Sequence, residues 1–159
     1  MAYNRYKPIF TMIFIIKSPR AIRKLIKSRL REFSSVKYIF NEMCFCILTA
    51  NFNAGRAIEM QEKIGNGFST FSLSQMRAAL KKYGHRFPNV RAKHILANRK
   101  YSRTISRYLD RKDEFKTREW VVNNITGLGY KEASHFLRNV GFKDIAIIDF
   151  HIIDLLVRK

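Results

Sequence analysis

The sequence predicts an all-α protein, an orthogonal bundle of about eight helices forming one domain over residues 1–159. Apolar residues recur at helical spacing in almost every segment. Glycine or proline marks the boundaries of most of these segments, and no two stretches alternate convincingly enough to indicate paired strands. With 159 residues, 47% of them hydrophobic, the chain can bury a sizeable core.

The N-terminal half is expected to begin with a helix capped by Ser18, with Pro19 at its first position. The stretch over residues 36–51 is apolar almost all round, which predicts a buried central helix. Its two cysteines, Cys44 and Cys46, have the spacing of neither a redox pair nor a metal site. They are expected to be buried free thiols in a reducing, intracellular compartment.

The remaining helices follow the central one with short connections. A turn-rich connector covers residues 65–72, and Pro88 predicts a loop that precedes a long basic helix. The expected helices span residues 53–64, 73–83, 90–109, 116–125, 130–140 and 149–159. The longest apolar run, residues 9–16, is much shorter than a membrane-spanning helix and lacks the features of a signal peptide, so no membrane partner is expected.

The charge balance points to a polyanionic partner. The chain has 31 Lys and Arg against 12 Asp and Glu, a formal net charge of +19. Such an excess repels itself in the folded state unless it meets opposite charge, so it favours nucleic-acid binding. The alternative is a generally cationic protein, for example of ribosomal type.

A helix-hairpin-helix is expected near the C-terminus. One helix ends near Ile125, the turn Gly127-Leu128-Gly129 follows, and a new helix begins. Two glycines allow positive φ angles and close approach of the backbone to a neighbour. Amide groups of the turn and of the following helix could then bind a phosphate, although such a turn on its own is more often only a connection.

Three side chains near this hairpin could carry chemistry. Lys131 lies in the first turn of the new helix, where the helix dipole disfavours the protonated amine and so favours its nucleophilic form; the neighbouring Glu132 opposes this. Asp149 opens the last helix, which also fits an ordinary N-cap. His151 fits either a phosphate contact or a plain surface residue.

The stretch "ITGLGYKEASHFLRNVGFKDIAIIDFHII" closely resembles the helix-hairpin-helix DNA glycosylase superfamily, and within it the archaeal-type 8-oxoguanine DNA glycosylases. The segments "FNEMCFCILTAN" and "GHRFPNVRAKHI" resemble the same family, so the likeness covers most of residues 40–153. It implies a base-excision repair enzyme that flips 8-oxoguanine out of double-stranded DNA, removes it and cuts 3′ to the site by β-elimination.

The resemblance also implies roles for individual residues. Lys131 would be the Schiff-base nucleophile and Asp149 its carboxylate partner. His151 and the hairpin glycines, Gly127 and Gly129, would contact the DNA backbone.

A second group of DNA contacts follows from the same resemblance. Asn51 would fill the gap left by the extruded base, with Asn53 and Arg56 beside it on the DNA. Phe87 would lie close to the lesion or its opposite base. The alternatives are a helix C-cap for Asn51 and a core aromatic for Phe87.

The family likeness further implies two helical lobes with the DNA cleft between them, a monomer, no metal and no organic cofactor, and a location in the cytoplasm with the chromosome. Family members continue beyond the position of Lys159, so the final helix and tail are expected to be truncated here. Two alternatives remain: a DNA-binding module with weakened catalysis, and a related glycosylase for another damaged base. The cysteine quartet that holds an iron–sulfur cluster in relatives acting on oxidised pyrimidines is absent from the sequence.

Overall fold

The computed structural model describes residues 19–158, apart from the side chain of Ala21. Within this range it contains nine α-helices, two short 3-10 helices and no strand, so the prediction of an all-α fold is confirmed. The apolar run over residues 9–16 and the expected cap at Ser18 lie outside the described residues. No helix between residues 19 and 158 is both long and apolar enough to cross a bilayer.

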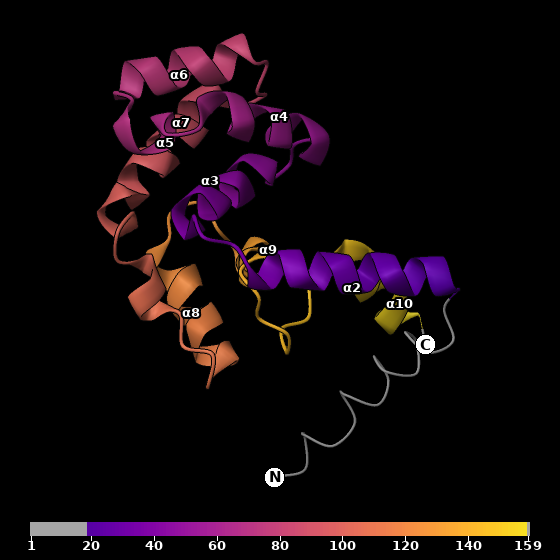
Figure 1. Ribbon diagram of the computed structural model, residues 1–159. Coiled ribbons are helices and arrows are strands. Elements are labelled where there is room, and N and C mark those ends of the chain that lie inside the picture. Colours follow the sequence, from indigo (N-terminus) through magenta and orange to yellow (C-terminus); the bar gives the residue numbers. More distant parts are fainter. Residues whose placement is uncertain (1–18, 159) are drawn as a thin grey trace.

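Figure 1 shows the order of the helices along the chain. Their bounds are α2 (Arg20–Ser34), α3 (Ile39–Thr49), α4 (Ala54–Ile64), α5 (Gly67–Thr70), α6 (Leu73–Lys82), α7 (Pro88–Ala97), η1 (Asn98–Tyr101), η2 (Ile105–Tyr108), α8 (Glu114–Asn124), α9 (Tyr130–Asn139) and α10 (Phe150–Val157).

Helix α3 is the centre of the bundle, as its nearly uniform apolar composition predicts. It packs against α4, α7 and α9, and its side chains Met43, Ile47 and Leu48 are fully buried. Cys44 and Cys46 are buried free thiols, as expected, and burial raises the pKa of both. Helices α4 to α7 lie together on one side of α3, whereas α8 and α9 lie on the other (Figure 1). The loop after α3 leads directly into α4, the first helix of the α4 to α7 group.

The prediction of one long basic helix over residues 90–109 is wrong. Helix α7 ends at Ala97 and the chain continues as two 3-10 turns. The reason is tertiary: the buried side chain of Asn98 bonds to the backbone of Thr126, which turns the chain away from the helix axis. Pro88 does not lie in a loop either, since it is the first residue of α7, where its fixed φ suits a helix start.

Two smaller expectations also change. The connector predicted after Gly65 contains the single-turn helix α5, which begins at Gly67. The first described helix has Pro19 as its N-cap and begins at Arg20, one residue later than expected.

Candidate active site

The hairpin between α8 and α9 depends on the glycine at its bend. Gly127 has φ +93, in the region that favours glycine, and a Cβ at this position would lie 2.4 Å from Nδ1 of His94 on α7. The hairpin therefore rests directly on α7. Gly129 was also expected to have a positive φ, and this is wrong: its φ is −84, and it serves as the extended N-cap of α9.

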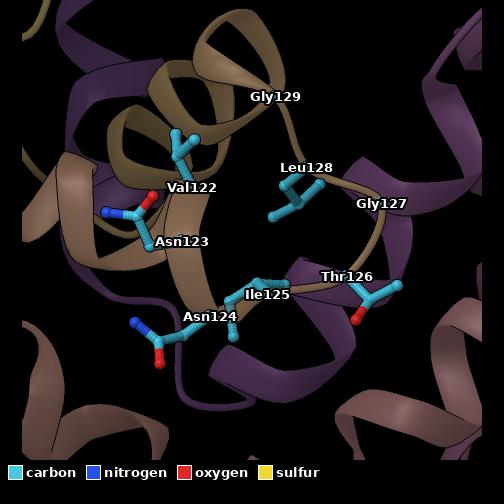
Figure 2. Close-up of a pocket in the computed structure, with 8 residues that line it drawn as sticks. All are labelled: Val122, Asn123, Asn124, Ile125, Thr126, Gly127, Leu128 and Gly129. Atoms are coloured by element: carbon cyan, nitrogen blue, oxygen red, sulfur yellow. The ribbon is translucent and has the colours of Figure 1, made fainter.

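A hollow of about 330 Å³ opens at the hairpin, lined by the uncharged residues 122–129 (Figure 2). A Cβ on Gly129 would make only an ordinary contact, 3.4 Å from Oε2 of Glu132. Packing within the protein therefore does not require a glycine at this position. The first amide groups of α9 have no partner within their helix. At the start of α9, the glycine backbone and the amide groups without a helical partner therefore form a suitable binding site for an anion.

Lys131 and Asp149 lie at the starts of two successive helices. Lys131 is exposed as the second residue of α9. Asp149 is the N-cap of α10, and its Oδ1 accepts the amide hydrogen of Ile152 at 3.1 Å. That hydrogen bond lowers the pKa of the Asp149 carboxyl, and the charges of His151 and Lys131 lower it further. The structure thus gathers the three residues, 20 positions apart at most, into one electrostatic neighbourhood.

His135 belongs to the same neighbourhood and was missed from the sequence. It is half-buried on α9, one turn after Lys131. Burial lowers the pKa of His135, as do the charges of Arg138 and Lys131, whereas Glu132 and Asp149 oppose the shift. The signal that could have found it is its i+4 spacing from Lys131, which places both side chains on one face of the helix.

Asn51 lies on the loop after α3. It is exposed and has φ +57, a conformation that asparagine tolerates just beyond a helix end. Asn51 lies one residue beyond Ala50, the C-cap of α3, so the alternative of a helix-ending residue agrees with the local geometry, and its contact with DNA stays a prediction. The loop is held by the buried Arg91 of α7, whose guanidinium donates to the Ala50 carbonyl at 2.6 Å.

Asn53 and Arg56 are tied into the start of α4. The Asn53 side chain accepts the amide hydrogen of Arg56 at 3.0 Å and so caps the helix. The Arg56 guanidinium donates to the carbonyls of Tyr83 and Gly84 at 3.3 and 3.2 Å. Both residues thus have structural partners, and their contact with DNA stays a prediction.

A buried histidine joins the loop after α3 to the loop before α7. The ring of His85 stacks on Phe52, 4.3 Å between centroids. Its Nε2 lies 3.0 Å from the Leu48 carbonyl, and its Nδ1 accepts the amide hydrogen of Phe87 at 3.0 Å, which assigns the Nε2–H tautomer. The Phe87 side chain is 36% exposed, so the alternative of a core aromatic is wrong. His85 and Arg91, both absent from the sequence prediction, thereby fix the loops that carry Asn51 and Phe87.

The environment of His85 predicts an acid-sensitive fold. Burial lowers the pKa of His85, with Arg91 and Arg56 adding to the shift and the bond to Leu48 opposing it. The unfolded chain binds this proton near pH 6.5 and the folded chain resists it, so the free energy of unfolding falls as the pH drops below about 6.5. We expect Tm to decrease between pH 7.5 and pH 5.5, and to decrease less in His85→Gln. An equal decrease in both proteins would assign the effect elsewhere, for example to His94 or His135, whose pKa values are also lowered by burial.

The residues around Lys131 on α9 and the loops held by His85 and Arg91 are linked through α7 and α9. Burial lowers the pKa of Arg91, and the negative charge of Glu132 opposes this shift. Arg91, which holds the Asn51 loop, therefore interacts electrostatically with Glu132, the residue next to Lys131. Among the described residues, no group of three or more His, Cys, Asp and Glu side chains could hold a metal ion. The candidate site brings together the amine of Lys131, the carboxylate of Asp149 and the imidazoles of His135 and His151. Arg91 and His85 anchor the loops that carry Asn51 and Phe87.

A helical bundle in which a glycine hairpin leads into a lysine-bearing helix, with a carboxylate capping the next helix, defines a helix-hairpin-helix protein with a candidate lysine–aspartate site. The sequence profile described as 8-oxoguanine DNA glycosylase matches residues 26–159, and the chain belongs to this family.

Individual relatives agree with this assignment. The chain is 45% identical over 141 residues to the 8-oxoguanine DNA glycosylase/AP lyase of Korarchaeum cryptofilum, covering 86% of this chain and 68% of the relative. It is 46% identical over 137 residues to that of Methanocaldococcus jannaschii, covering 83% of this chain and 66% of the relative. The chain thus spans about two thirds of the length of these relatives.

Solved structures show the same fold. The crystal structure of Methanocaldococcus jannaschii 8-oxoguanine glycosylase/lyase in complex with 15mer DNA containing 8-oxoguanine aligns with a TM-score of 0.79 at 44% identity, covering 86% of this chain and 69% of that chain. The 8-oxoguanine DNA glycosylase of Thermotoga maritima aligns with a TM-score of 0.80 at 37% identity, covering 93% of this chain and 74% of that chain.

Proposed function

We propose that this chain removes 8-oxoguanine from double-stranded DNA and then cleaves the strand 3′ to the vacated sugar, as a DNA glycosylase with AP lyase activity. Lys131 is its nucleophile and Asp149 the carboxylate that assists it. The observation that carries the proposal is their placement at the starts of successive helices directly after the hairpin, close enough for the charge of Lys131 to lower the pKa of Asp149.

DNA binding follows from charge and backbone geometry. The net charge of +19 supplies affinity for phosphates without reading sequence, which suits a lesion that can arise anywhere. The hairpin amides hold one phosphate group near Gly129, with His151 on the adjacent helix start. Because a stacked base is out of reach, the damaged nucleotide must leave the duplex, and Asn51 on its anchored loop occupies the gap.

The chemistry then needs one amine and one negative charge. The neutral Nζ of Lys131 attacks C1′ as the glycosidic bond breaks; the bond's electron pair leaves with the base, and the nitrogen gives up one of its two protons, which ends on that base. The nitrogen lone pair then expels O4′, which takes up the second amine proton, so the sugar ring opens to an imine at C1′. The imine makes the C2′ proton acidic, and loss of this proton expels the 3′ phosphate and cuts the strand. Asp149, a carboxylate that is ionised at neutral pH, stabilises the positive charge that develops at the sugar; its hydrogen bond to the Ile152 amide lowers its pKa further.

Excision of 8-oxoguanine from a duplex under single-turnover conditions tests the proposal. We expect Asp149→Asn to slow base release about 10²-fold or more, because the stabilising charge is lost. Asparagine also caps helices well, so the start of α10 is retained and Tm should change little.

Asp154→Asn is the matched control, since Asp154 lies on the same helix and pairs with Arg158 at an exposed position. Its excision rate should equal that of the unmodified chain. Equal rates for the two variants would remove Asp149 from the mechanism. Firm binding by the unmodified chain without any excision would instead favour a DNA-binding module.

A further inference from the structure

The buried side chain of Asn98, which does not belong to the hairpin, forms hydrogen bonds with the hairpin backbone. Asn98, the first residue of η1, is fully buried. Its Nδ2 donates to the carbonyls of Thr126 and His94, both at 2.9 Å, and its Oδ1 accepts the amide hydrogen of Thr126 at 3.0 Å. One side chain therefore binds both backbone polar groups of the hairpin residue that precedes Gly127.

The hairpin has little internal support. Its own backbone contributes a bond from the Leu128 amide to the Ile125 carbonyl at 3.3 Å, slightly longer than the usual range for such bonds. On its inner side, Gly127 packs against His94 of α7. Both the packing contact of Gly127 with His94 and the hydrogen bonds of Thr126 with Asn98 thus come from the α7–η1 segment, about 30 residues earlier in the chain.

Helix α9, which carries Lys131, is anchored independently of Asn98. Its side chains Phe136 and Leu137 are fully buried. At its other end, Asn139 donates to the Glu42 carboxylate of α3 at 2.5 Å. A change at Asn98 can therefore loosen the turn without displacing the helix of the nucleophile.

We propose that Asn98 is a positioning residue for DNA binding, which holds the hairpin amides in their phosphate-binding geometry before DNA arrives. The proposal rests on the function proposed above. A turn that is ordered in advance loses less conformational freedom on binding, so Asn98 contributes to affinity. It does not contribute to the chemical step, because α9 is held elsewhere.

Asn98→Asp tests this with an isosteric change. It keeps the acceptor for the Thr126 amide and replaces the donor that faces two carbonyls with an acceptor. The matched control is Asn66→Asp, at an exposed position before α5 where the side chain makes no capping bond, so the net charge of the two variants is equal. The probes are a duplex with a tetrahydrofuran abasic analogue for Kd and an 8-oxoguanine duplex for the single-turnover rate at saturation.

We expect Asn98→Asp to bind the abasic duplex about tenfold or more weakly than Asn66→Asp, with a rate at saturation within about threefold of it. The difference in Kd between Asn98→Asp and Asn66→Asp should become smaller from pH 8 to pH 5.5, because the Asn98→Asp carboxyl regains one hydrogen-bond donor when it is protonated. Asn98→Ser, which loses the bonds without adding charge, should show the same split between Kd and rate and no such pH dependence.

Equal Kd values for Asn98→Asp and Asn66→Asp would overturn the proposal. So would a saturated rate that falls in parallel with affinity, because Asn98 would then act on the nucleophile or on the whole fold. If Asn98→Asp does not fold, the same comparison with Asn98→Ser decides. Failure of the unmodified chain to excise 8-oxoguanine would refute the proposed function alone, since the Kd comparison does not depend on turnover.

Discussion

Lys131→Gln is expected to lower the rate of 8-oxoguanine excision on the order of 10⁴-fold or more, the scale of losing a covalent nucleophile. Glutamine has no basic amine and cannot form the imine on which both base release and strand cleavage depend. The side chain is exposed at the start of α9, so its replacement should leave the fold intact. Single-turnover kinetics on a duplex with one 8-oxoguanine measure the effect.

Binding should be nearly unaffected by this substitution, because one positive charge among 31 contributes little to the grip on phosphates. Lys143→Gln, at an exposed position between α9 and α10, removes the same charge and should keep the full excision rate. A Lys131→Gln protein that matches Lys143→Gln in rate would mean that another amine performs the chemistry.

Gly127→Ala is expected to reduce the free energy of unfolding by about 2–5 kcal/mol, combining backbone strain with overpacking. The added Cβ would lie 2.4 Å from Nδ1 of His94, and φ is +93. Affinity for duplex DNA should fall as well, since the hairpin must shift away from α7. Chemical denaturation and titration with duplex DNA measure the two effects.

Two variants separate the causes. In Gly127→Ala with His94→Ala the two closest overlaps, with Nδ1 and Cγ of His94, are gone and only the 3.2 Å contact with its Cβ stays, so part of the lost stability should return, whereas the strain from positive φ stays. Gly129→Ala should cost less than about 1 kcal/mol in stability, because its backbone is extended and its new Cβ makes only ordinary contacts. If Gly127→Ala is as stable as Gly129→Ala, the close packing of the hairpin on α7 is incorrect.

The features that could be predicted from the sequence have local causes. The apolar pattern around Met43 and Leu48 identifies the buried α3, and Gly65 and Gly141 end helices through positive φ angles that depend on the glycine itself. Asp149 could be placed as an N-cap because its partner lies three residues away.

The features that were missed depend on distant backbone groups. His85 bonds to the carbonyl of Leu48, 37 residues earlier, and Arg91 to that of Ala50, 41 residues earlier. Asn98 ends the expected long helix by bonding to Thr126, 28 residues later. A backbone carbonyl exists at every residue and so leaves no mark in the sequence. Local patterns therefore located Lys131 and the hairpin, whereas the residues that hold the surrounding loops required the fold.

Reduction with borohydride during the reaction, followed by peptide mapping, tests most directly whether Lys131 is the nucleophile. We expect one covalent link between protein and 8-oxoguanine DNA. Because a modified Lys131 resists trypsin, the DNA-linked peptide should run from Glu119 to Arg138 with its internal lysine uncleaved. A link at any other amine, or no link in a chain that binds the damaged duplex firmly, would show that Lys131 is not the nucleophile.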